Sequence, residues 1–137
     1  MHDGDALVRY LHGEITLEAF ASAIRSKVIF EFRGDARAIR VRKPLAARLR
    51  VAPSDLRPFL LRYVVGTVTA EMISMWAWVL VTLTAFERPG GSPAAETLWE
   101  CMRELSQLPI AENVTPRRVA RILAKLPSIE RELAREA

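Results

Sequence analysis

The sequence is poor in the residues on which metal sites, disulfides and common catalytic centres depend. Its 137 residues include two histidines and one cysteine, Cys101. One cysteine excludes an internal disulfide, and no Cys-x-x-Cys, His-Glu-x-x-His or glycine-rich phosphate-loop pattern is present. Cys101 lies on an apolar stripe of helical spacing, which favours a buried, unreactive thiol. We therefore expect no metal, no cofactor and no enzymatic activity.

A long hydrophobic run is also missing. The stretch from Met72 to Phe86 has fifteen residues without a charge, and as a helix it would reach about 22 Å, less than the ~30 Å core of a bilayer. We expect a buried helix over residues 70–87, with Trp76 and Trp78 at the centre of the core. The first ten residues carry two aspartates and no apolar run, unlike a secretory signal. These absences favour a cytoplasmic protein of bacterial type without membrane association.

Apolar residues at helical spacing predict a single, mostly helical α+β domain. Asp55 is the expected N-cap of its helix, which places Pro58 at the third helical position. The tail 128–137 has only Ile129 and Leu133 as apolar anchors, so it is expected as a loosely docked helix or as frayed chain. The expected helices cover residues 4–11, 16–24, 55–65, 70–87, 93–108 and 116–126.

Between residues 27 and 51 the apolar period changes to two, which predicts a β-hairpin packed on the helical core. Gly34 and Asp35 accept the backbone angles of a tight turn and form the expected hairpin loop. The segment that follows has two interpretations. Residues 45–51 continue as the third strand of a meander, or residues 44–48 form a helical turn.

Two expected helix-to-helix joints, at residues 9–18 and 62–71, share the pattern R-Y-x-x-G-x-[I/V]-T-x-E. The glycine ends one helix, and a β-branched residue packs into the elbow. The threonine caps the next helix, while the glutamate faces the positive end of that helix's dipole. The repeat is either an internal duplication or the independent use of the same helix-corner residues. In both cases we expect the pattern to be structural, because its residues do not form a catalytic set.

The first joint belongs to a longer pattern, L-x-x-Y-L-x-G-x-I-T-x-E-x-F over Leu7 to Phe20. This pattern resembles the start of colicin D-type immunity proteins and related small bacterial immunity proteins. The resemblance implies an all-helical inhibitor of a nuclease, a kind of protein that tends to be acidic. This chain differs from those proteins in its predicted hairpin and in its positive net charge. The resemblance assigns no binding residues.

The net charge of +4 comes from one segment. Residues 33–50 hold seven basic and one acidic residue, against three and five in residues 1–32 and ten and ten in residues 51–137. Such an arginine face suits an acidic protein surface, or the phosphates of a nucleic acid or another polyphosphate, and it also serves as a solvated edge that prevents strand-to-strand aggregation. Exposed stacking aromatics are not expected there, since Phe30 and Phe32 point to the core. The candidate partner-binding residues are Arg33, Arg37, Arg40, Arg42, Lys43, Arg48 and Arg50.

A second basic group, Arg117, Arg118 and Arg121, lies at the start of the expected helix 116–126. This helix looks like the DNA-reading helix of a helix-turn-helix, although the preceding join, 109–114, is longer than the turn of that motif. The alternative is an amphipathic terminal helix with a charged outer side.

The expected function is non-catalytic binding by a small bacterial immunity or regulatory protein. Its partner is expected to be a protein with an acidic surface that meets the arginine-bearing hairpin. The alternative is a nucleic-acid-binding protein that uses the basic hairpin 33–50 or the helix 116–126. The sequence fixes neither the partner nor the oligomeric state.

Overall fold

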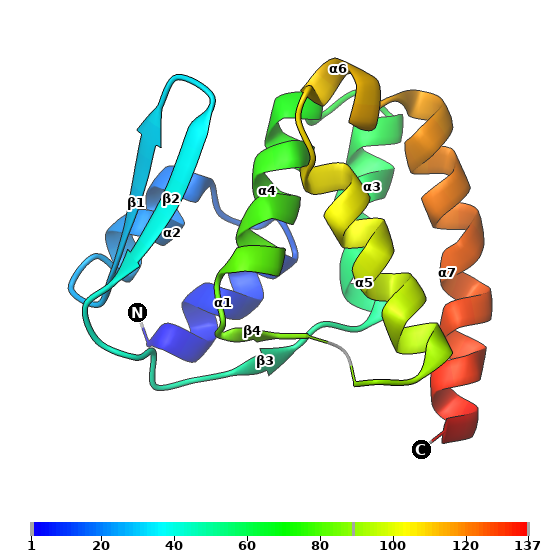
Figure 1. Cartoon of the computed structure of the whole chain (residues 1–137), viewed down its shortest axis with the longest axis horizontal. Coiled ribbons are helices and arrows are strands. Elements are labelled where there is room, and N and C mark those ends of the chain that lie inside the picture. Colours follow the sequence, from blue (N-terminus) through cyan, green and yellow to red (C-terminus); the bar gives the residue numbers. More distant parts are fainter. Residues whose placement is uncertain (1, 89, 137) are drawn as a thin grey trace.

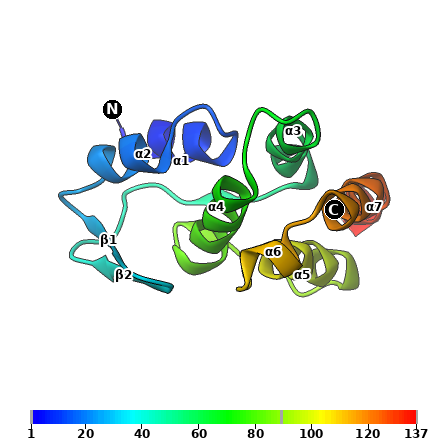
Figure 2. The same ribbon diagram turned by 90° about the horizontal axis from the view of Figure 1, so that it is seen from above.

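A computed structural model describes residues 2–88 and 90–136 of the chain as a mostly helical α+β domain. The helices pack side by side, with α4 (Ala70–Thr82) at the centre of the group. The β-hairpin lies at one side of the helices (Figures 1 and 2). The other helices are α1 (Asp3–Leu11), α2 (Leu17–Ala23), α3 (Pro53–Val64), α5 (Pro93–Ser106), α6 (Ile110–Asn113) and α7 (Pro116–Glu136). The strands are β1 (Val28–Arg33), β2 (Ala36–Val41), β3 (Leu49–Arg50) and β4 (Phe86–Glu87).

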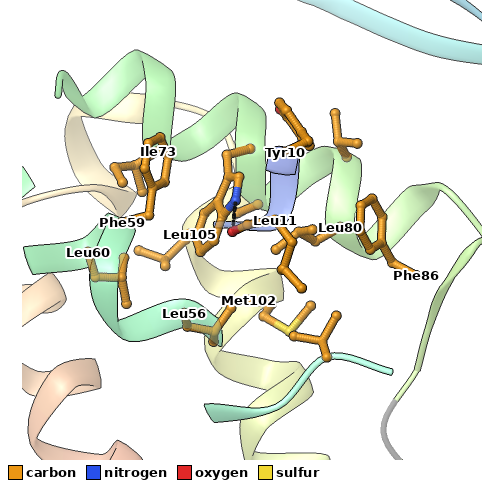
Figure 3. Packing of buried hydrophobic residues seen from close by; sticks show 14 of the residues in the cluster. Tyr10, Leu11, Leu56, Phe59, Leu60, Ile73, Leu80, Phe86, Met102 and Leu105 are labelled. Carbon is orange, nitrogen blue, oxygen red and sulfur yellow. Dashed lines mark hydrogen bonds between the residues drawn. The ribbon is translucent and has the colours of Figure 1, made fainter. Parts of the chain in front are cut away.

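Helix α4 forms the centre of the core, as its sequence predicts. The side chains of Ile73, Trp76 and Leu80 are at most 1% exposed, and Figure 3 shows residues of α1, α3, α4 and α5 pointing toward one another. The indole Nε1 of Trp76 donates to the backbone oxygen of Leu11 at 3.1 Å, so the one polar atom of this ring is satisfied inside the core. Trp78 is only partly buried, at the margin of the core rather than at its centre.

The prediction that this helix continues to residue 87 is wrong for its last five residues. Leu83 has an extended backbone, and Phe86 and Glu87 form β4, which pairs in parallel with β3. The pairing with β3 provides hydrogen-bond partners for backbone groups that would otherwise have bonded within a longer helix. The Phe86 side chain remains buried.

The predicted hairpin is confirmed. Strands β1 and β2 pair antiparallel from Val28 opposite Val41 to Arg33 opposite Ala36. Gly34, with φ 58°, and Asp35 form the loop.

A third strand of this sheet does not form, and residues 44–48 do not form a helical turn. The backbone amide of Ala46 donates to the Asp3 carboxylate at 2.9 Å. This contact holds the chain against α1, so Leu49 and Arg50 reach β4 instead of β2.

Helices α3 and α7 differ from their predicted limits. Helix α3 begins two residues before Asp55, whose carboxylate accepts from the Ala52 amide at 2.8 Å; Asp55 is therefore the third helical residue and not the cap. Pro58 consequently lies in the helix interior. Helix α7 does not end at residue 126: it passes through Pro127 and reaches Glu136, and the buried Ile129 docks this part on the core.

Caps at other helix starts agree with the sequence. Ser92 accepts from the amide of Ala95 at 3.2 Å, and Thr115 from the amide of Arg118 at 3.1 Å. Helix α5 ends at Ser106, before the predicted residue 108, and the short helix α6 occupies most of the join to α7.

The two helix corners that share a sequence pattern also share a backbone geometry. Gly13 and Gly66 have φ values of 72° and 85°, the left-handed conformation of a helix C-terminus. The backbone amide of each glycine donates to the backbone oxygen of the tyrosine three residues earlier, at 3.0 Å. The backbone amide of the residue after each glycine donates to the backbone oxygen of the arginine five residues before it, at 2.8 or 2.9 Å. Thr16 and Thr69 then cap α2 and α4, accepting from the amides three residues ahead. The structural role predicted for the pattern is confirmed at both corners.

Candidate functional site

The hairpin presents two different faces because side chains alternate along each strand. The cross-strand pairs Phe30–Ile39 and Phe32–Arg37 share the face toward the helices. The Phe30 ring lies 6.0 Å from that of Phe20, and the Phe32 ring stands edge-on to Trp78 at 6.0 Å. Both phenylalanines therefore point toward the helices, but Phe32 remains 44% exposed, so the prediction that no aromatic ring is exposed on the hairpin is wrong for Phe32.

Arg37, one of the candidate partner-binding residues, also lies on this inner face and not among the outward-facing candidates. Its guanidinium donates to Ser74 Oγ at 3.2 Å and to the Ser106 backbone oxygen at 3.4 Å. The two serines are the buried polar residues of the described part of the chain. Burial lowers the pKa of Arg37 from its ordinary value. Arg37 thus fastens the hairpin to α4 and α5, and it is not part of the outer basic surface.

The outer basic surface consists of the six remaining candidates, all of them exposed. Two lie on the outer face of the hairpin, two at its base and two at or beside β3. Arg40 contacts Glu31 at 2.9 Å, and Arg50 lies 4.0 Å from Glu87. The other four have no carboxylate within 4.0 Å among residues 2–88 and 90–136. The outer basic surface comprises Arg33, Arg40, Arg42, Lys43, Arg48 and Arg50.

The arginines at the start of α7 have a different environment. Arg118 and Arg121 both contact Glu104 Oε1, at 3.1 and 2.7 Å, and Arg118 also donates to the Asn113 side chain at 3.3 Å. Arg117 is exposed. Since α6 has only four residues, the element before α7 is not the full first helix of a helix-turn-helix. Two of the three guanidinium groups in this candidate DNA-reading helix are therefore engaged inside the protein.

His12 and Cys101 have structural surroundings: the first is paired with a carboxylate and the second is buried. His12 Nε2 lies 2.9 Å from Asp55 Oδ1, a contact that links the end of α1 to the first turn of α3. Cys101 is 3% exposed, and burial raises the pKa of its thiol, which keeps it protonated and weakly reactive. Within the described ranges, no three His, Cys, Asp or Glu residues are grouped so as to hold a metal ion.

A cavity that no sequence motif indicated lies between the two helix corners. It has a volume of about 530 Å³, and both corners contribute to its lining, including Glu18 from the first and Glu71 from the second. The sequence assigns these glutamates only to helix starts. The available signal was the repeated pattern itself, which places a carboxylate in the first turn of each of two helices, and both first turns line this cavity.

None of the helices in the described part of the chain combines the length and apolarity needed to cross a bilayer. Comparisons of the chain with protein-family models, with curated proteins and with solved structures found no match.

Proposed function

We propose that this protein is a non-catalytic binding module that docks the outer basic surface onto an acidic surface of another protein. The observation that carries the proposal is the contrast in charge pairing. Glu104 accepts both Arg118 and Arg121, whereas four residues of the outer basic surface lack a carboxylate partner within the described chain. Unpaired guanidinium groups keep their capacity for bidentate bonds to carboxylates, and they speed the encounter with an acidic partner.

The aromatic residues of the hairpin favour a protein partner over a single-stranded nucleic acid. Binding of single strands combines a basic groove with exposed rings on which bases stack. Phe30 is partly buried against Phe20, and Phe32, which is 44% exposed, stands edge-on to Trp78 on the inner face, so neither ring lies among the arginines of the outer face. The outer face of the two strands instead presents Ile29, Glu31 and alanines between its arginines. This mixture of small, apolar and charged side chains suits a protein surface.

An immunity or regulatory protein acts in this way, by occupying its partner's surface without chemistry. The pattern over residues 7–20, with its resemblance to small bacterial immunity proteins, supports this class. A cytoplasmic location also belongs to the proposal, since the single cysteine is a buried free thiol.

The test is affinity capture from a lysate of the source cells at low salt and at about 0.3 M salt, where exposed charges are strongly screened. Three baits are compared: the wild type, Arg33→Glu/Arg42→Glu, and Lys125→Glu/Arg131→Glu as control. The control makes the same change in net charge at exposed positions of α7. Mass spectrometry identifies retained proteins, and nuclease treatment distinguishes them from material bridged by nucleic acid.

We expect one specific protein to be retained by the wild type and the control at both salt concentrations, and lost with Arg33→Glu/Arg42→Glu. Retention of nucleic acid alone, only at low salt, would replace the proposal with nucleic-acid binding, because counterion release makes that affinity steeply salt-dependent. Equal retention by all three baits would remove the outer basic surface from the interface.

A further inference from the structure

The cavity between the two helix corners has the size and form of a small-molecule site. Its volume of about 530 Å³ lies within the range of roughly 300–1,000 Å³ that is usual for such sites. Corner 9–18 and corner 62–71 both line it, and they are joined where the guanidinium of Arg62 donates to the Gly13 backbone oxygen. Residues about fifty positions apart in the chain are thereby held around one space.

Aromatic and methionine side chains line the apolar part of this cavity. Tyr10, Phe59 and Trp76 come from three different helices, and the rings of Phe59 and Trp76 lie 4.9 Å apart. Met72 and Met75 complete the wall on the α4 side. Methionine is flexible and polarizable, so such a wall adapts to apolar ligands of different shapes.

Three exposed carboxylates belong to the lining of this cavity. Glu14, Glu18 and Glu71 line the cavity and are exposed, against one cationic residue, Arg62. None of the three carboxylates has a cationic partner within 4.0 Å in the described chain. Glu18 and Glu71 also lie in the first turns of helices, where a negative charge is favourable. Glu14 lies outside any helix and has no such role.

A cation already packs on an aromatic ring at this site. The guanidinium carbon of Arg62 lies 5.5 Å from the centre of the Phe59 ring. Aromatic faces attract cations, most strongly where water is excluded. With three carboxylates against one guanidinium, the lining still carries an excess of two negative charges.

We propose that this cavity binds a small organic cation, a molecule with an apolar body and a positively charged amine end. The apolar body contacts the aromatic and methionine wall, and the amine lies at the opening among the three glutamates. This site is independent of the outer basic surface. It lies on other elements, and its charge is of the opposite sign.

Three probes with one carbon skeleton and different charge test the proposal: phenylbutylamine, phenylbutanol and phenylbutyrate. Each is titrated into the full-length protein while amide and indole NMR signals are followed. We expect shifts centred on Gly13, Thr16, Thr69 and the Trp76 indole, with the amine binding about tenfold more tightly than the carboxylate. The neutral alcohol should fall between them.

Two variants separate the charge from the cavity. Glu18→Gln/Glu71→Gln should weaken binding of the amine about three- to tenfold and leave the alcohol unchanged, since each exposed carboxylate contributes a modest attraction. Met75→Trp fills the cavity and should abolish binding of all three probes. Glu100→Gln/Glu132→Gln removes two exposed carboxylates elsewhere and serves as control.

Equal affinity for the amine and the carboxylate would overturn the proposed charge preference. Probe shifts that persist unchanged in a folded Met75→Trp variant would place the ligand elsewhere. Since Glu18→Gln/Glu71→Gln leaves the core intact, it tests the proposal even where Met75→Trp fails to fold.

Discussion

The two helix corners, 9–18 and 62–71, have the same sequence pattern and the same backbone hydrogen bonds but different surroundings. In the first corner, Tyr10 is 4% exposed and stacks on Phe20 with ring centres 4.5 Å apart. In the second, Tyr63 is partly exposed. A side chain added at Gly13 would collide with the Phe59 ring, whereas one added at Gly66 would meet open space.

The short sequence pattern determines the backbone conformation of each corner, and the surrounding residues determine how much each side chain contributes to stability. Both glycines need the left-handed conformation because the pattern turns the chain there in the same way. The energetic importance of each residue depends instead on what packs against it. Single substitutions at equivalent positions should therefore have unequal effects, larger in the first corner for the tyrosine and the glycine and larger in the second corner for the arginine.

The tyrosines give the largest expected difference. Tyr10→Ala should lower the free energy of unfolding by about 3–5 kcal/mol, because it removes a buried ring and leaves a cavity beside Phe20. Tyr63→Ala should cost about 1 kcal/mol, since its ring is only partly buried. Urea unfolding followed by circular dichroism measures both. Similar losses for the two variants would contradict the difference in packing.

The glycines come next. Gly66→Ala should cost about 1–2 kcal/mol, the strain of a left-handed alanine. Gly13→Ala adds a collision with Phe59 to the same strain and should cost about 3 kcal/mol or more. Because Phe59 also lines the cavity, Gly13→Ala should also disturb the Trp76 indole NMR signal, and Gly66→Ala should leave that signal unchanged.

Much of the fold could be predicted because local rules specify it. The caps at Thr16, Thr69, Ser92 and Thr115 and the hairpin loop follow from residue types at fixed spacing, and all are present in the structure. The errors arise where distant residues decide. Pairing of β3 with β4 ends α4 early, and the Asp3 carboxylate redirects the chain after the hairpin; no pattern within either segment encodes such contacts.

The candidate site shows the same limit. Strand alternation places Arg37 on the inner face of the hairpin, but its hydrogen bond to Ser74 joins residues 37 positions apart. The pairing of Arg118 and Arg121 likewise depends on Glu104 in the preceding long helix. The sequence gives the number of arginines in a segment, and only the tertiary structure separates paired guanidinium groups from available ones.

The arginines of the two corners should differ by a smaller amount. Arg62→Ala removes the hydrogen bond to Gly13 and the contact with Phe59, which are partly screened by solvent, so we expect a loss of about 1 kcal/mol. Arg9 forms no side-chain hydrogen bond or ion pair within the described residues, and Arg9→Ala should stay within about 0.5 kcal/mol of the wild type. Thermal unfolding distinguishes the two, and a larger loss for Arg9→Ala would contradict the asymmetry.

Replacing each tyrosine with phenylalanine isolates the hydroxyl group and makes the smallest change at neutral pH. Burial, reinforced by the Glu18 charge, raises the pKa of Tyr10 far above its ordinary value, and burial raises that of Tyr63 as well. A folded-state pKa above the unfolded one means that the unfolded chain loses the proton first. The corresponding stability is complete below about pH 10, the ordinary tyrosine pKa, and falls as pH rises beyond it. Tyr10→Phe should therefore reduce the alkaline loss of stability clearly, and Tyr63→Phe only slightly. Urea midpoints between pH 8 and 11 measure this, and an unchanged alkaline slope in Tyr10→Phe would contradict the burial of that hydroxyl in the first corner.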